Sequence, residues 1–72
     1  MNNYLLKEAT KMAVMTTSTF DLNLEDTDVL TKLIMEFYED IEAFAQMLEF
    51  SNDEIENMNA TTAEKLISKY ID

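Results

Sequence analysis

Carboxylates are the residues of this chain that could do chemistry, and the most regularly spaced of them are Glu36, Glu39 and Glu42. Paired carboxylates can act as acid and base, provided that a cleft pushes their pKa values apart. A chain of 72 residues has little interior in which to form such a cleft. The sequence also has no histidine, no cysteine and no glycine, so it lacks imidazole and thiol chemistry and any glycine-rich loop for phosphate. We therefore expect a protein that is not an enzyme.

Divalent metal binding is the next chemistry to consider, because Asp21, Asn23 and Glu25 match positions one, three and five of a calcium-binding loop. The match fails at position six, where Asp26 replaces the usual glycine, and at position twelve, where Lys32 replaces a bidentate glutamate. The glutamates at 36, 39 and 42 also have no histidine in the Glu-x-x-His spacing of di-iron sites. We expect neither a metal nor another cofactor.

Acidic charge dominates the chain and indicates the kind of partner. Its 15 acidic and 5 basic residues give a formal net charge of −10, and between Lys11 and Lys65 the only basic residue is Lys32. Such a field repels nucleic acid and anionic lipid and attracts basic protein surfaces. Residues 51–70 have the layout of a helix-turn-helix, but they contain only two lysines and the chain has no arginine to contact phosphates. We expect no direct binding to nucleic acid and none to membranes.

The elements that must position these acids are helices. The chain has no glycine and no proline, whereas small β-rich domains need tight turns built on glycine. Apolar spacing predicts one helix at about 3–15 and a long central helix from Asp26 or Thr27 to about Phe50. Two further helices are predicted after Ser51 and after Thr61, because each of these residues is followed three positions later by a glutamate in the capping-box pattern.

The helix ends and connections are predicted from local residue types. The hydroxyl-rich run 16–20 predicts an end or a fraying of the first helix, because such side chains lower helix propensity. Polar and apolar residues alternate over 21–25, which predicts an extended connection or a short strand. Asparagine must replace glycine wherever a helix ends in a left-handed residue, and the candidates are Asn23, Asn57 and Asn59.

Each predicted helix has an apolar side from which the core can be built. The apolar half of the central helix consists of Val29, Leu30, Leu33, Ile34, Phe37, Tyr38, Ile41, Phe44, Ala45 and Leu48. The other helices contribute Leu5, Ala9, Met12 and Ala13, then Ile55 and Met58, and finally Ala63, Leu66, Ile67, Tyr70 and Ile71. We expect residues 1–72 to form one acidic all-α domain, a small bundle of three to four helices organised around the long central helix.

The acidic stripe, defined here as Glu36, Glu39 and Glu42, lies opposite the apolar half of the central helix, with Asp40 at its flank. Such a stripe has an ordinary interpretation, which is a solvated face that keeps the helix soluble. However, like charges one turn apart repel by a few tenths of a kcal/mol, and Lys32 can reach only Glu36. Carboxylates about 5 Å apart along the helix axis also resemble the charge spacing of a phosphate backbone, so a nucleic-acid-binding protein could take the stripe for DNA.

Two methionines and three acids complete the predicted partner-binding surface. Met35 projects between Glu39 and Glu42, and Met47 lies at the apolar border, where an exposed apolar side chain beside acids is typical of an interface. Further acids would continue the stripe around the corner after the central helix. The predicted partner-binding residues are Glu36, Glu39, Asp40, Glu42, Met35, Met47, Asp53, Glu54 and Glu56.

Size and charge together favour a non-enzymatic regulator. We expect an acidic binding protein that inhibits or regulates a basic or nucleic-acid-binding protein, with DNA mimicry as one mechanism. The alternative is a structural or assembly adaptor that self-associates, or binds a partner helix, through its apolar face. A homodimer would enlarge a small core. The chain lacks a signal-peptide pattern and a long apolar run, which predicts a cytoplasmic protein, and small acidic inhibitors of this kind are typical of phages and mobile elements.

Overall fold

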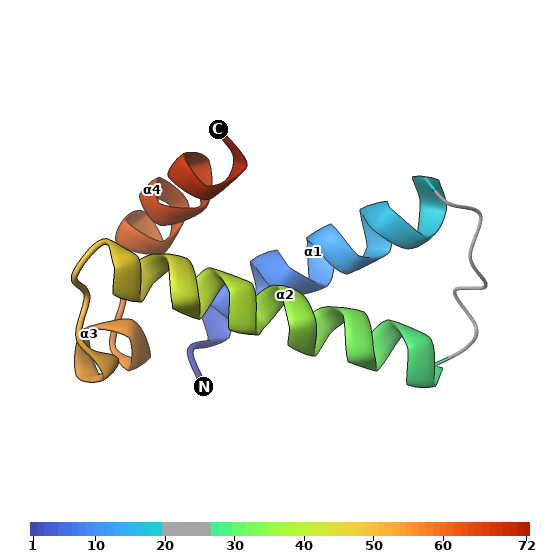
Figure 1. The fold of residues 1–72 in the computed structure, drawn as a ribbon, viewed down its shortest axis with the longest axis horizontal. Helices are drawn as coiled ribbons and strands as arrows, with labels where there is room; N and C mark the ends of the chain where they lie inside the picture. Colours follow the sequence, from blue (N-terminus) through green and yellow to red (C-terminus); the bar gives the residue numbers. More distant parts are fainter. Residues whose placement is uncertain (20–26) are drawn as a thin grey trace.

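The computed structural model describes residues 1–19 and 27–72, and these residues form four helices. They are α1 (Asn3–Thr19), α2 (Thr27–Met47), α3 (Asn52–Glu56) and α4 (Ala60–Ile71). Helices α1 and α2 run side by side in opposite directions and form the closest pair (Figure 1). The described residues contain no strand, so the predicted all-α bundle organised around a long central helix is confirmed.

The core lies between α1 and α2 and is built largely on small residues. Leu5, Ala9, Ala13 and Thr17 follow one another at four-residue steps along α1, and all are fully buried. They face a buried row on α2 that includes Ile41. Alanine at such a contact lets two helix backbones approach closely, because little side-chain volume separates them.

Helix α4 adds a second packing layer at one end of the pair. Its residues Ala63, Leu66 and Ile67 are buried, as predicted. The rings of Phe44 on α2 and Tyr70 on α4 meet edge to face, with their centroids 5.6 Å apart. Helix α4 then points away from the pair, so it covers only the end near α3 (Figure 1).

The first helix continues further than the sequence indicates. The predicted helix at about 3–15 is too short, because α1 extends to Thr19, and this end falls within the run 16–20 in which an end was predicted. The hydroxyl of Thr17 donates a 2.8 Å hydrogen bond to the carbonyl oxygen of Val14, one turn earlier. That bond satisfies the polar group of a fully buried side chain, so burial of Thr17 outweighs the low helix propensity of the run.

The central helix ends three residues before the predicted Phe50, in a Schellman motif. Glu49 has a positive φ of 72°. The N–H of Glu49 donates to the carbonyl oxygen of Gln46 at 3.0 Å, and the N–H of Phe50 donates to the carbonyl oxygen of Ala45 at 3.1 Å. Phe50, the residue after the left-handed position, packs against the core. This turn directs the chain into α3.

The prediction that asparagine takes the left-handed conformation at helix ends is wrong for two of the three candidates. Asn57, the C-cap of α3, has a φ of −103°. Asn59 has a φ of −85° and caps the start of α4, where its side-chain oxygen accepts the N–H of Thr62 at 2.9 Å. Among the described residues the positive φ falls instead on Glu49. The third candidate, Asn23, lies outside the described residues.

The predicted capping boxes had different outcomes. Ser51 and Glu54 form the complete box at the start of α3, as predicted. The box expected at Thr61 is wrong, because α4 already begins at Ala60 with Asn59 as its cap. An asparagine two residues upstream therefore takes the capping role that the threonine was expected to have.

Several predicted core residues lie at the surface. Val29 and Leu48, at the two ends of the apolar half of the central helix, have 38% and 40% of their surface exposed, and Ile71 has 70% exposed. These three assignments are wrong because α4 covers only the end of α2 near α3 and then points away from the pair. Val29 lies at the opposite end of α2, Leu48 only borders α4, and Ile71 lies at the far end of α4 itself. The predicted connection at 21–25 and the candidate cap Asp26 lie outside the described residues. Among the described helices, none combines the length and apolar character needed to cross a membrane.

Candidate protein-binding site

The acidic stripe winds around the solvent side of α2. Each three-residue step moves about 60° around an α-helix, so the stripe turns from the outer side of α2 at Glu36 toward the α1 contact at Glu42. Glu36 and Glu39 are exposed, whereas Glu42 is half-buried. Position 42 is one turn after Tyr38, which is buried, and this neighbour accounts for the partial cover of Glu42.

Carboxylates from two helices converge near the hydroxyl of Tyr38. Burial of the phenol is the main cause that raises the pKa of Tyr38 above its usual value, and the charges of Glu42 and Glu56 raise it further. A hydrogen bond from the backbone N–H of Asn2 lowers the pKa in part. The fold therefore brings Glu56, from the end of α3, into the electrostatic neighbourhood of the stripe.

Asn2 fixes the position of α3 beside α1 and α2, and sequence reasoning missed it. Its side-chain oxygen accepts the N–H groups of Tyr4 and Leu5, which makes Asn2 the N-cap of α1. Its side-chain nitrogen donates to the carbonyl oxygens of Ile55 and Met58 at 2.8 and 2.9 Å. The residue is only 3% exposed. An asparagine just before an amphipathic run was the available signal for the cap, whereas nothing local indicates the bonds to residues more than fifty positions away.

The three acids predicted to extend the stripe are exposed, but two of them also have structural partners. Glu56 accepts a 2.8 Å hydrogen bond from the amino group of Met1. Glu54 closes the capping box by accepting the N–H of Ser51 at 3.0 Å. Asp53 lies in the first turn of α3, where negative charge is favourable. These contacts make Glu54 and Glu56 less available to a partner than the stripe itself.

Asp40 and Met47 lie apart from the other predicted residues. The pKa of Tyr70 on α4 is raised mainly by burial and further by the charge of Asp40, which places Asp40 toward α4. Met47 is 79% exposed at the end of α2, and twelve residues carry it about a third of a turn around the helix from Met35. Met35, 38% exposed, shares its side of the helix with Glu39 and Glu42. The predicted surface therefore divides in two. The main part consists of Met35 and the acidic stripe, and Asp40 and Met47 lie apart from it.

The negative charge of the main part is uncompensated. In residues 1–19 and 27–72 the ion pairs join Met1 with Glu56 and Lys11 with Glu8, and neither pair involves the stripe. Among the same residues, no cluster of three acidic side chains could hold a metal ion. The stripe is thus arranged to present charge outward.

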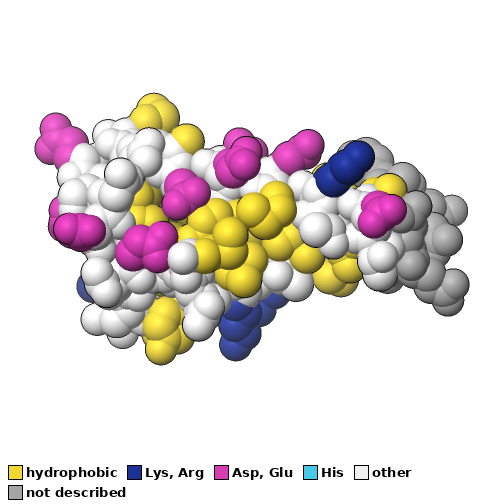
Figure 2. Space-filling view, turned by 90° about the horizontal axis from the view of Figure 1, so that it is seen from below, with side chains coloured by type: hydrophobic (Ala, Val, Ile, Leu, Met, Phe, Trp, Pro, Cys, Tyr) yellow, Lys and Arg dark blue, Asp and Glu magenta, His cyan; other side chains and the backbone are white. Residues whose placement is uncertain are grey.

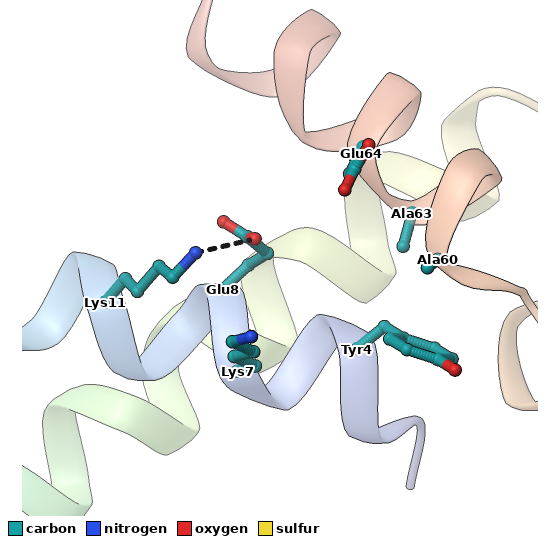
Figure 3. Close-up of a pocket in the computed structure, with 7 residues that line it drawn as sticks. All are labelled: Tyr4, Lys7, Glu8, Lys11, Ala60, Ala63 and Glu64. Carbon is teal, nitrogen blue, oxygen red and sulfur yellow. Dashed lines mark hydrogen bonds and ion pairs between the residues drawn. The ribbon is translucent and has the colours of Figure 1, made fainter.

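A small cavity between α1 and α4 offers little room for a ligand (Figure 3). Its volume is about 160 Å³, below the roughly 300 Å³ at which ligand pockets begin. Two lysines and two glutamates line it together with small residues, and Lys11 already pairs with Glu8 at 3.4 Å. The complete lining is Tyr4, Lys7, Glu8, Lys11, Ala60, Ala63 and Glu64. Because its charges balance, the cavity selects neither anions nor cations.

Comparison of the chain with models of protein families, with curated proteins and with solved structures finds no match in any of the three.

Proposed function

We propose that this chain is a non-enzymatic acidic binding protein that regulates or inhibits a partner through a basic surface, such as that of a nucleic-acid-binding protein. One observation carries the proposal: Glu36, Glu39 and Glu42 follow one another along α2 without an ion pair among the described residues. Repulsion within such a row costs stability, and its charge accelerates encounter with a basic surface.

Blocking by charge mimicry follows from the same row. A basic groove that normally holds a phosphate backbone attracts any regular line of negative charge, whether this comes from DNA or from carboxylates, and salt weakens both interactions. The exposed part of Met35 adds an apolar contact within the charged surface, which lowers the dissociation rate once the complex has formed. The partner site is then occupied and unavailable to nucleic acid.

The test is affinity capture from a lysate of the native host with three matched samples: the wild-type chain, the Glu39→Lys/Glu42→Lys variant, and the wild-type chain with competing duplex DNA. We expect basic proteins that the wild type retains, the variant loses and the DNA displaces. Circular dichroism must show that the variant keeps its helices. Retention of the same proteins by the variant contradicts the proposal, and binding that is insensitive to salt supports the adaptor alternative.

A further inference from the structure

The face of the α1–α2 pair turned away from α4 is apolar in the middle and charged at its edges. Figure 2 looks onto this face, where hydrophobic side chains gather between an edge that carries several acidic side chains and one basic side chain and an opposite edge that carries lysine. Helix α4 packs against the other side of α1, over Tyr4, Glu8 and Lys11. No described element covers the face in Figure 2.

The apolar part of this face surrounds Tyr38. Met35 precedes Tyr38 by three residues and Glu42 follows it by four, so the three side chains are neighbours on α2. On α1, Leu6 lies one turn after Asn2, whose N–H bonds to the Tyr38 hydroxyl at 2.7 Å. Leu6 packs against the core cluster that contains Tyr38, and Met35 lies one turn before Tyr38 on α2.

A row along α1 extends the apolar surface. Leu6, Thr10 and Val14 follow at four-residue steps, and Val14 is 39% exposed. The hydroxyl of Thr10 donates to the carbonyl oxygen of Leu6 at 2.8 Å, so its polar group is already satisfied within the helix. We call the surface formed by Leu6, Thr10, Val14 and Met35 the open face.

We propose that the open face binds a basic amphipathic helix of a partner protein. Two antiparallel helices form a groove that accepts a third helix, with the apolar ridge of the third helix facing the groove. Glu39 and Glu42 lie along the α2 edge of this groove, so the cations of the bound helix point toward that edge. A second copy of the chain fits less well, because it carries the same net charge of −10.

This inference rests on the proposed function, and it adds an apolar helical ridge as the element that the partner must supply. It is tested with a synthetic labelled peptide of about 18 residues that places leucines at helical spacing and lysines on the remaining positions. The control is a scrambled peptide with the same composition and charge but no apolar ridge. Fluorescence anisotropy measures the affinity of both.

We expect the wild type to bind the patterned peptide about tenfold more tightly than the scrambled one. Met35→Gln removes an apolar contact without changing charge, and it should reduce affinity for the patterned peptide about tenfold. Met47→Gln is the matched control, because Met47 is more exposed than Met35 but lies about a third of a turn away around α2, and it should have no effect. Circular dichroism checks that both variants are folded.

The remaining outcomes separate this inference from the proposed function. Equal binding of the two peptides, weakened only by Glu39→Lys/Glu42→Lys, would overturn the helix-binding open face and leave the acidic surface as the binding element. If the Glu39→Lys/Glu42→Lys variant binds the patterned peptide as tightly as the wild type, the acidic edge does not contribute to binding. That result contradicts the proposed function as well. No binding of either peptide, or a wild-type dimer that Met35→Gln dissociates in sedimentation, overturns the assignment of a basic helix to this face.

Discussion

The backbone N–H of Asn2 donates a 2.7 Å hydrogen bond to the hydroxyl of Tyr38, which is 2% exposed. Because the side chain of Asn2 also caps α1 and binds the carbonyl oxygens of Ile55 and Met58, one residue joins the start of α1, the middle of α2 and the end of α3. Helices α1 and α3 are otherwise not in close contact. Asn2 therefore holds the end of α3 beside the acidic stripe, together with the bond from the amino group of Met1 to Glu56.

Replacing Asn2 with alanine should destabilise the fold more than any ordinary loss of a helix cap. The change removes the cap and the side-chain donor that binds the carbonyl oxygens of Ile55 and Met58, which together cost about 2–4 kcal/mol. Asn59→Ala is the matched control, since Asn59 caps α4 from an exposed position with one hydrogen bond, and it should cost about 1 kcal/mol. Urea denaturation measures both free energies of unfolding. Equal losses would contradict the joining role of Asn2.

Removing the hydroxyl of Tyr38 should also be costly. Tyr38→Phe keeps the ring but leaves the N–H of Asn2 buried without its acceptor, at a cost of about 1–3 kcal/mol. Tyr70→Phe serves as the control, because the Tyr70 hydroxyl has no hydrogen bond within the described residues and its ring contact with Phe44 survives the change. We expect Tyr70→Phe to cost less than about 0.5 kcal/mol. If the two variants unfold at the same urea concentration, the hydrogen bond to Asn2 contributes nothing.

Stability should decline in alkaline solution because of the same two tyrosines. The pKa values of Tyr38 and Tyr70 are raised in the folded chain, chiefly by burial of the phenols, so folding favours the protonated form. This contribution is fully present below the unfolded pKa of about 10 and is lost as the pH rises through the folded values. The Tyr38→Phe/Tyr70→Phe variant should lose less stability than the wild type between about pH 9 and 11. A parallel decline in both proteins would assign the effect to other groups.

Local sequence signals predicted the elements of the fold better than the contacts between them. The box of Ser51 and Glu54 and the apolar spacing of the helices are short-range patterns, and these predictions are confirmed. The bonds of Asn2 join residues far apart in the chain, so no local pattern contains them. The length of α1 depends in the same way on the burial of Thr17, which outweighs the low helix propensity of that residue.

The candidate site was predictable in part for the same reason. The three-residue spacing of the stripe is a local property, and the structure places Glu36 and Glu39 at the surface as that spacing indicates. Asp40 lies toward α4, and Met47 lies about a third of a turn around α2 from Met35, so the predicted surface is not continuous. The open face could not be predicted, because it depends on which side of the helix pair α4 leaves uncovered.

Glu49 offers a position where substitution should stabilise the chain. Its φ of 72° is costly for a residue with a Cβ, and its negative charge lies at the C-terminal end of α2. Glu49→Gly removes both costs and should raise the free energy of unfolding by about 1 kcal/mol. Glu49→Gln removes the charge alone and should give only a few tenths of a kcal/mol. A destabilising effect of the glycine would show that Glu49 makes a compensating contact.

The acidic stripe should lower the free energy of unfolding, because its carboxylates repel one another. Such a cost favours a surface kept for binding over a face kept only for solubility. Glu39 is one turn from both Glu36 and Glu42, so Glu39→Gln should raise the free energy of unfolding by a few tenths of a kcal/mol. Asp53→Asn also removes one exposed charge, but from the favourable first turn of α3, and should lower the free energy by a similar amount. Salt screens both effects, so thermal unfolding at about 10 mM and 500 mM salt should show the two variants moving toward the wild type from opposite sides. A loss of stability in Glu39→Gln would mean that the carboxylate serves the fold, and the argument for a binding surface on the stripe would lose its main support.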